Sequence, residues 1–338
     1  MTDAASASID TSEGSTHRVN YLAAIREAQV EELRRDDSVI MMGEDLVASL
    51  FGTASGFLDE FGPKRIRDTP ISEAGFAGAA IGAAMTGLRP IVDFSVSTFL
   101  YSAMDQIVSQ AAKIRYMSGG QASIPLVFRA GEFFGSGDAA HHSDRPHSMF
   151  MTVPGLKIIA PTTPYDIKGL LKTAIRDDDP VLCFEAKTLW NEREHIPDDE
   201  YLIPFGQGDV KREGTDVTIV AIGAAVPHAV AAAATLSEQG ISAEVVDPRS
   251  LVPFDWDMVF TSVAKTSRLV VADPAPLTCS TASEVVATVT EAMFGDLTAA
   301  PVRVTTPDIQ IPFSPTMEAG LYPDAAKIAA AAERVMKG

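Results

Sequence analysis

Short apolar runs alternate with helical segments along most of this chain, and this alternation restricts the fold more than any other feature. Parallel strands that are buried on both faces read as continuous apolar runs, and each needs a helical crossover to reach the next strand. The sequence therefore predicts an α/β fold with parallel sheets covered by helices on both faces. The expected strands cover 38–43, 90–94, 125–129, 156–160, 180–185, 216–223, 243–247, 269–273 and 302–304, and the expected helices cover 21–35, 57–61, 99–116, 165–176, 226–239, 256–265, 283–294 and a final segment after Pro323.

The alternation lapses once, between about residues 187 and 214, where polar and turn-forming residues take over. A chain of 338 residues also exceeds the size at which single hydrophobic cores usually stop growing, about 250–300 residues. We therefore expect two doubly wound α/β domains. They comprise residues 17–188 and 214–338, joined by a linker over 189–213 and preceded by a disordered tail over 1–16.

Charge and cysteine content limit the possible partners and the compartment. The formal net charge is −18, which argues against nucleic acid or an anionic membrane as a partner. The chain has two cysteines, Cys183 and Cys279, far apart in the sequence, so a disulfide framework is not expected. The first residues lack a basic start and an apolar core, and no apolar run reaches the roughly 18 residues of a membrane span. A soluble cytoplasmic protein is expected.

A carboxylate stands at a predicted helix entrance. Glu73 follows the turn-prone residues 68–70 and precedes a run of small residues from Ala74 to Ala83. A helix N-terminus favours negative charge, and small side chains let another backbone or a flat ligand approach closely. These residues alone favour a helix-capping acid, because caps are far commoner than catalytic acids, and leave a catalytic carboxylate as the alternative.

A glycine-rich loop with three histidines follows the expected strand 125–129. It carries His141, His142 and His147, and loops beyond the carboxyl ends of parallel strands commonly bind ligands. The histidine spacing is not a known metal-ligand pattern, whereas imidazole titrates near neutrality and suits proton transfer. A metal cluster, a proton-transfer histidine and a purely polar loop all remain open from these residues.

Many adjacent motifs, in one order, resemble the beta subunit of the thiamine-dependent decarboxylating component of 2-oxo acid dehydrogenase complexes. The resemblance runs from about residue 17 to the C-terminus. It implies a transketolase-like architecture, with a pyrimidine-binding domain followed by a transketolase C-terminal domain. The matching segments include 43–45, 61–62, 65–78, 87–91, 103–107, 110–113, 116–121, 154–157, 161–166, 168–171, 174–177, 247–255 and 265–268.

The resemblance implies roles for individual residues around bound thiamine diphosphate. Glu73 would hydrogen-bond the aminopyrimidine ring nitrogen and so promote removal of the thiazolium C2 proton. Phe99 matches an aromatic residue that faces the pyrimidine ring, and Glu44 falls among the cofactor-binding residues. His142 matches the family histidine that serves proton transfer and acyl transfer to the lipoyl disulfide.

The family also implies metal ions and a partner chain. Its potassium site of backbone carbonyls maps to Leu126, Ala174, Asp177 and Asp179, although 177–180 reads equally well as an acidic turn. The Gly-Asp-Gly segment and downstream Asn that hold Mg²⁺ and the diphosphate are absent from this sequence, and in the family they belong to an alpha subunit. The resemblance therefore implies half of an active site, completed in an α2β2 heterotetramer.

Several segments depart from the usual family pattern and leave the substrate open. His141-His142-Ser143-Asp144, with His147 beyond, stands where Gln-His-Ser-Gln and an acid are usual, so His141, Asp144 and His147 are candidate substrate-loop residues. Residues 132–134, 273–276 and 49–52 are also altered. Three functions remain. The first passes the acyl group of a small 2-oxo acid to a lipoyl acyltransferase core. The second is acetoin cleavage or carboligation without lipoyl transfer. The third is a non-enzymatic scaffold, against which Glu73 and His142 argue.

Overall fold

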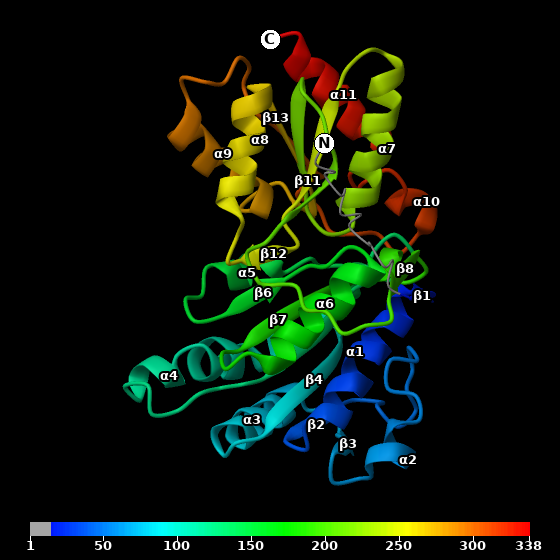
Figure 1. Ribbon diagram of the computed structural model, residues 1–338, viewed down its shortest axis with the longest axis vertical. Coiled ribbons are helices and arrows are strands. Elements are labelled where there is room, and N and C mark those ends of the chain that lie inside the picture. Colours follow the sequence, from blue (N-terminus) through cyan, green and yellow to red (C-terminus); the bar gives the residue numbers. More distant parts are fainter. Residues whose placement is uncertain (1–14) are drawn as a thin grey trace, which may run out of the picture.

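The structure, a computed structural model that describes residues 15–338, contains two helix-covered sheets stacked along the long axis of the molecule (Figure 1). The larger sheet has seven strands in the order β12-β6-β7-β5-β4-β2-β3, and only β12 runs antiparallel to its neighbour. The predicted α/β fold with doubly wound parallel sheets is confirmed. The strands of this sheet are β2 (Val39–Gly43), β3 (Ile66–Asp68), β4 (Arg89–Val96), β5 (Val127–Glu132), β6 (Lys157–Ile159), β7 (Val181–Ala186) and β12 (Ser250–Val252).

Helices cover both faces of the larger sheet and complete what we call the first unit. Alternate residues of β2 show the two faces, since Val39 and Met41 pack towards α1 and α6 while Ile40 and Met42 pack towards α3. This two-sided burial explains why the strands read as continuous apolar runs. The helices of the first unit are α1 (Tyr21–Arg35), α2 (Phe57–Phe61), α3 (Glu73–Met85), α4 (Ile114–Met117), α5 (His147–Met151) and α6 (Pro164–Arg176).

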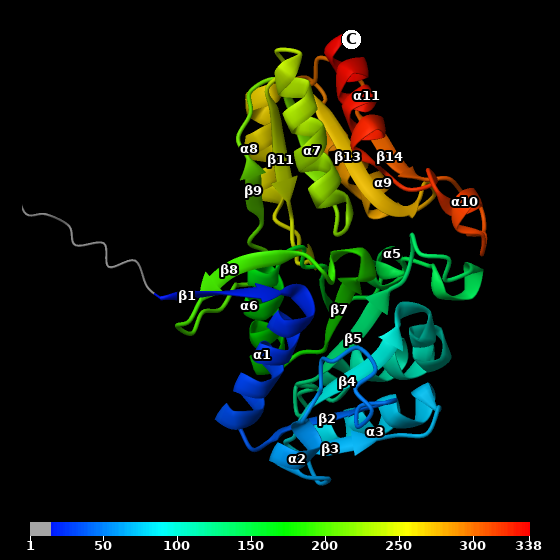
Figure 2. The same cartoon turned by 90° about the vertical axis from the view of Figure 1, so that its right-hand side faces the viewer.

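The smaller sheet and its helices form the second unit. Its strand order is β14-β13-β10-β11-β9, and only β9 is antiparallel to its neighbour. Helices α7 and α11 cover one face and α8 and α9 the other (Figure 2). The elements are β9 (Asp209–Arg212), β10 (Val217–Ala221), α7 (Ala225–Glu238), β11 (Ala243–Asp247), α8 (Trp256–Thr266), β13 (Leu269–Pro276), α9 (Thr281–Met293), β14 (Val302–Thr306), α10 (Pro315–Glu318) and α11 (Ala325–Met336).

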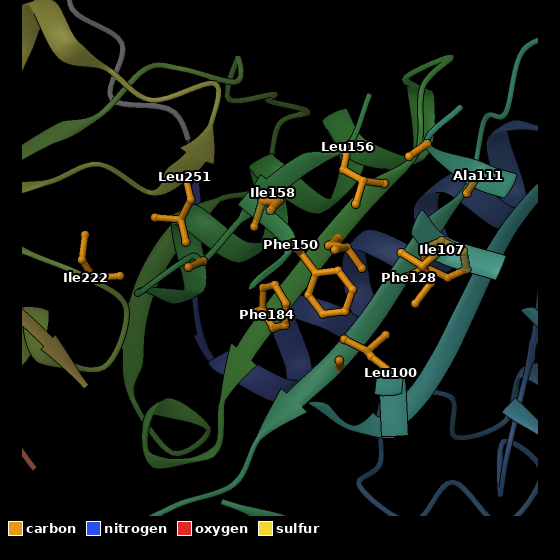
Figure 3. Packing of buried hydrophobic residues seen from close by; sticks show 14 of the residues in the cluster. Leu100, Ile107, Ala111, Phe128, Phe150, Leu156, Ile158, Phe184, Ile222 and Leu251 are labelled. Atoms are coloured by element: carbon orange, nitrogen blue, oxygen red, sulfur yellow. The ribbon is translucent and has the colours of Figure 1, made fainter. Parts of the chain in front are cut away.

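One hydrophobic core runs from the first unit into the second. A single buried cluster contains Phe128, Phe150 and Phe184 of the first unit together with Ile222 of the second unit (Figure 3). The same cluster contains Leu251, which follows β11 in the sequence. Leu251 lies in β12, which adds an antiparallel strand to the first sheet beside β6. The two units are therefore joined by a shared core and by strand pairing.

The segment 99–116 differs from the single helix predicted for it. A 3-10 helix (Ser97–Ala103) is followed by a π-helix (Gln106–Ala111) and then by α4. Beyond the π-helix, the Ala112 carbonyl packs so closely on Gly155 that a Cβ there would lie 2.1 Å from the oxygen. A close backbone contact with a distant residue thus accompanies the irregular winding, and helix propensity does not report such contacts.

Five strands of residues 15–338 were missed by the sequence prediction: β3, β9 and β12, each three or four residues long, and two strands at the margin of the first unit. β1 (Thr16–Asn20) pairs antiparallel with β8 (Arg193–Pro197), and both strands are mostly polar, so neither forms an apolar run. Residues 1–14 of the predicted tail lie outside the described residues, and its last residue, Thr16, begins β1. Within residues 15–338, no helix is both long and apolar enough to cross a membrane.

Candidate functional site

Most of the candidate residues lie at one edge of the larger sheet. Strands β2, β4 and β5 are parallel, so their carboxyl ends share an edge. Glu44 directly follows β2, the 3-10 helix that carries Phe99 directly follows β4, and the loop to His142 follows β5. In open α/β sheets this edge is where ligands bind.

Glu73 is the first residue of α3, as the sequence predicted. The side chain is half-buried, and Ser72 before it makes no capping hydrogen bond through its hydroxyl. Beyond Glu73, Ala74, Gly75 and Gly78 lie on an exposed face of the helix that carries almost no side-chain bulk. A groove of about 660 Å³ borders this face, lined by Met42, Val47, Leu58, Pro63, Ile66, Arg67, Asp68, Thr69, Pro70, Ser72, Gly75, Phe76 and Ala79.

Glu44 contributes a second carboxyl group near Glu73. Its Oε1 atom is buried and has no hydrogen-bond partner among residues 15–338. Burial, and then the charges of Glu73, Asp45 and Asp93, raise the pKa of Glu44. The hydroxyl of Thr69, which lines the groove beside α3, is also buried without a partner in the described chain. Buried polar atoms without partners are rare, so this pair indicates a place for a polar ligand.

His142 faces Phe99 across the same edge. The two rings meet edge to face with centroids 5.6 Å apart, and the His141 ring lies 4.1 Å from that of His142. Burial, and then the neighbouring His141, lower the pKa of His142, so its imidazole is neutral near pH 7. Thr98 fixes the loop here, because its Oγ1 donates to the His141 carbonyl at 2.7 Å. A neutral imidazole can accept or donate a proton in this position.

Asp144 lies beside the segment that carries Phe99. Its carboxylate accepts a hydrogen bond from Tyr101 Oη at 3.1 Å, and its carbonyl accepts one from Ser97 Oγ at 3.1 Å. Both partners belong to the 3-10 helix after β4. Asp144 therefore holds the histidine loop against that helix.

His147 lies apart from the other two histidines. It is 1% exposed, with Nδ1 3.0 Å from Glu132 Oε1 and Nε2 3.4 Å from Asp273 Oδ1. Burial lowers the pKa of His147, but the neighbouring Asp273 and Glu132 carboxylates outweigh this and raise it to about 10. The residues that depart from the family pattern at 132, 147 and 273 thus meet in one buried cluster between the two units. This contact accounts for them without a substrate.

The altered segment 49–52 meets the altered segment 132–134 in an aromatic cluster. Phe51 lies 5.6 Å from Phe133 and 4.9 Å from Trp190 between ring centroids. Lys187 Nζ lies over the Phe133 ring at 4.6 Å and 2.7 Å from Asp138 Oδ1, which links the cluster to the histidine loop. Sequence reasoning missed Lys187 and Trp190, although their position just after a strand end was a usable signal.

A buried ion-pair network joins the strands that end at this edge of the sheet. The Arg129 guanidinium makes paired hydrogen bonds to the Glu185 carboxylate at 2.8 and 2.9 Å, which links β5 to β7. It also reaches Asp93 Oδ2 on β4 at 3.0 Å and Gln29 Oε1 on α1 at 2.8 Å. Paired Arg–carboxylate hydrogen bonds are geometrically specific, so the strand ends are held in a fixed arrangement.

Three of the four carbonyls predicted to bind potassium already have protein donors. Leu126 O accepts from Val181 N at 3.0 Å, Ala174 O from Asp177 N at 3.3 Å, and Asp177 O from Arg89 Nη1 at 2.9 Å. A carbonyl oxygen has two lone pairs, so these contacts leave acceptor capacity. In residues 15–338, no group of three or more His, Cys, Asp or Glu side chains has the arrangement of a metal site, so the predicted alternative of a histidine metal cluster gains no support.

Comparison with known proteins agrees with this geometry. Residues 17–192 match the transketolase pyrimidine-binding domain, and residues 206–328 match the transketolase C-terminal domain. The fold and the edge site therefore define a two-domain protein of the transketolase type. Among solved structures, a split-gene transketolase described as an inactive beta4 tetramer has the same fold, with a TM-score of 0.76 at 23% identity, covering 93% of this chain and 97% of that one.

Curated relatives narrow the family further. The beta subunit of acetoin:2,6-dichlorophenolindophenol oxidoreductase from Bacillus subtilis is 45% identical over 320 residues, covering 90% of this chain and 93% of that protein. The beta subunit of the pyruvate dehydrogenase E1 component from Rickettsia felis is 41% identical over 320 residues, covering 94% and 98%. The chain therefore belongs to the family of beta subunits of the thiamine-dependent decarboxylating components of 2-oxo acid dehydrogenase complexes. This finding confirms the resemblance predicted from the sequence.

Proposed function

We propose that this chain forms half of a thiamine diphosphate site and is active only when an alpha subunit supplies the other half. The complex would decarboxylate a small 2-oxo acid and transfer the acyl group to a lipoyl group. The observation that carries the proposal is the placement of Glu73 at the start of α3, near Glu44, whose buried Oε1 has no partner among residues 15–338, together with the contact of Phe99 with His142 at the same edge of the sheet.

The residues at this edge fit an aminopyrimidine ring. The buried Oε1 of Glu44, which has no partner among residues 15–338, can accept a hydrogen bond from the amino group, and the Thr69 hydroxyl can donate one to a ring nitrogen. The side-chain-poor face of α3 leaves room for a flat ring, and Phe99 offers an aromatic face. When bound, the cofactor supplies a nucleophilic carbon and an electron sink for cleavage of the bond next to a carbonyl.

Two side chains of this chain would handle protons. Glu73 would share a proton with the pyrimidine ring nitrogen, and such acid-base help contributes typically about 10²–10⁴-fold in rate. His142, neutral because of its lowered pKa, would take or give a proton at the acyl-transfer step. His141 and Asp144 would shape the substrate entrance beside it.

The ions and partner belong to the same proposal. An alpha subunit in an α2β2 heterotetramer would hold Mg²⁺ and the diphosphate. Potassium would bind the carbonyls of Leu126, Ala174, Asp177 and Asp179 and tie the 174–179 turn to the strand ends. If so, replacing Na⁺ by K⁺ at constant ionic strength should raise the melting temperature, and equal melting in both salts would remove the ion from the proposal.

Acetoin cleavage is the second candidate. It is favoured by the 45% identity to the acetoin:2,6-dichlorophenolindophenol oxidoreductase subunit, against 41% for the pyruvate dehydrogenase subunit. Both candidates use the same residues of this chain, so the substrate has to be found by experiment.

A reconstitution assay tests the proposal. The chain is co-expressed with its alpha partner, and pyruvate, branched-chain 2-oxo acids and acetoin are offered with an artificial electron acceptor. We expect turnover from the complex and neither turnover nor tight thiamine diphosphate binding from this chain alone. Full activity from the isolated chain would contradict the shared site. Acetoin turnover without oxo acid turnover would replace the first candidate by the second, and a lipoyl-domain acceptor then reports whether acyl transfer follows.

A further inference from the structure

A buried carboxylate of the second unit binds the loop that presents His142. Glu318 ends α10 and is 2% exposed. Its Oε1 accepts a hydrogen bond from Gly135 N at 2.6 Å, and its Oε2 accepts one from Gly137 N at 2.8 Å. Tyr322 Oη donates to Oε1 as well, at 2.6 Å. Hydrogen bonds to an ionised acceptor are roughly twice as strong as neutral ones, so this contact fixes the start of the loop.

The backbone of the loop is adapted to this contact. Gly135 and Gly137 have backbone φ angles of 79° and 74°, which residues other than glycine rarely adopt. A Cβ on Gly137 would lie 3.1 Å from the Phe313 carbonyl oxygen, so the loop is pressed against the segment that leads into α10. The loop and the C-terminal segment are therefore packed together as one piece.

Other contacts hold the loop between Glu318 and His142. Lys187 Nζ binds Asp138 Oδ1 at 2.7 Å, and Ser143 Oγ donates to the Ala139 carbonyl at 2.6 Å. Thr98 Oγ1 holds the His141 carbonyl. The side chains on this path come from the first unit, whereas the Glu318 contact comes from the second.

A cation that lies over two neighbouring aromatic rings reinforces the same junction. The Arg145 guanidinium lies over the rings of Phe134, at 5.4 Å, and Tyr322, at 5.1 Å. Its Nε donates to the Pro274 carbonyl of β13 at 2.9 Å. Tyr322 thus contacts both the clamping carboxylate and the arginine that follows the histidines.

We propose that Glu318 is a positioning residue for His142, acting through the backbone of Gly135 and Gly137; this inference rests on the proposed function. The carboxylate fixes where the loop begins, and the first-unit contacts then fix where His142 meets Phe99. Without the Glu318 carboxylate, the N–H groups of Gly135 and Gly137 lose their acceptor, and the loop is no longer held in the position that directs the imidazole. The second unit thereby takes part in catalysis without touching the substrate.

Single variants in the α2β2 complex give the first test. In Glu318→Gln, an amide NH₂ replaces one acceptor oxygen, and kcat for acyl transfer should fall by up to about 100-fold, as small misplacements of a reacting group can cause. Tyr322→Phe, which keeps the carboxylate, should lose only a few-fold. Thiamine diphosphate affinity should not change in either variant. Glu291→Gln, an exposed glutamate on α9, is the matched control and should behave as wild type.

A double-mutant cycle separates positioning from general damage. If Glu318 acts through His142, Glu318→Gln should cost little further activity in a His142→Ala background. Equal losses with and without His142 would overturn the inference. So would wild-type kcat in Glu318→Gln.

A structural readout keeps the test independent of substrate. If the wild-type complex turns over none of the offered substrates, the proposed function fails, and the positioning inference is judged by the loop itself. Glu318→Gln should increase amide hydrogen exchange over residues 133–145 and move the pKa of His142, measured by NMR, up towards its ordinary value. Unchanged exchange together with an unchanged His142 pKa would refute the positioning role.

Discussion

A carboxylate in the first turn of a helix benefits from the helix dipole whether or not it takes part in a reaction. Glu73 shows why position alone could not decide its role. The sequence predicted the helix entrance correctly, but the nearby Glu44 carboxyl, whose buried oxygen has no partner in residues 15–338, became visible only in the structure. Two acids close together are costly in a chain by itself and useful where a ligand brings hydrogen-bond donors.

Glu73→Gln tests the residue-scale proposal most directly. We expect turnover of the reconstituted complex to fall by about 10²–10⁴-fold, because the amide cannot share a proton with the ring nitrogen. The melting temperature should change little, since the side chain is only half-buried and lies at the very start of α3. Steady-state kinetics and circular dichroism melting check both parts. Near-normal turnover would leave Glu73 a helix-capping residue.

Glu44→Gln should separate stability from function. A raised pKa means that the folded state favours the protonated acid. The resulting penalty on stability is absent below the unfolded pKa of about 4.3 and grows as pH rises through the raised value. The variant chain should therefore be as stable as wild type near pH 4 and more stable at pH 8 by urea unfolding, while the complex binds thiamine diphosphate more weakly. Lower stability at pH 8 would contradict this account.

Helix α3 illustrates how a whole element can be prepared for a partner. Phe76, Ala80 and Ile81 are buried against the first sheet, while Gly78 and Gly82 lie on the exposed face. Small residues let a second backbone or a ring approach closely, and an exposed glycine in a helix costs roughly 1 kcal/mol relative to alanine. The chain keeps these glycines despite that cost, as expected for a face that is covered in the assembly.

Gly82→Leu tests that face. A Cβ at Gly82 would meet nothing within 4 Å, so the isolated chain should fold and gain helix stability. Assembly with the alpha subunit should nevertheless weaken strongly, as measured by sedimentation or mass photometry of the mixed chains. Gly295→Leu, where a Cβ also meets nothing within 4 Å, is the control and should assemble normally. Normal assembly of Gly82→Leu would show that this face stays uncovered.

The elements also show where sequence reasoning succeeds and stops. The nine expected strands are all present, because parallel strands buried on both faces leave continuous apolar runs. Within residues 15–338 five further strands escaped prediction. β1 and β8 form a small polar ribbon, and β3, β9 and β12 are only three or four residues long, so none of them carries such a run. For the site, the family resemblance assigned Phe99 and His142 to one cofactor, and the structure brings their rings into contact after β4 and β5. The contact of Gly135 with Glu318 joins residues 183 positions apart, and no local pattern reports it.

The junction between the two units carries charge at the scale of the whole molecule. His147 from α5 lies between Glu132 at the end of β5 and Asp273 in β13, and all three are buried. Asp166 of α6 likewise binds Arg249 at 2.9 Å and Lys211 at 2.9 Å. Removing one member of a buried ion pair leaves the other charge buried without a partner, which destabilises the fold. Because these pairs join the two units, separating the units carries the same penalty, and we expect the two units to unfold together.

Stability should therefore fall at alkaline pH through His147. Its pKa is raised to about 10, so its contribution is complete below the unfolded pKa of about 6.5 and is lost as pH rises through 10. Burial raises the pKa of Asp273, but His147 outweighs this and lowers it, so the contribution of Asp273 to stability is lost only in acid.

Urea unfolding from pH 6 to 10 should show the decline in stability in the wild type and a flatter profile in His147→Gln. This variant should also be less stable at pH 6 by about 3–5 kcal/mol. The exposed His228→Gln should match wild type, and an unchanged slope in His147→Gln would exclude His147 as its origin.

The pairing of β12 with β6 has a consequence for how the chain must be made. Residues 250–252 complete an edge of a sheet whose other six strands end by residue 186. During synthesis the backbone groups along β6 stay open until much of the second unit has left the ribosome, and an open strand edge invites pairing with other chains. A fragment that stops near residue 205 would keep that edge uncovered for good. Nascent chains therefore depend on chaperones or rapid completion, and expression should start from the full-length gene.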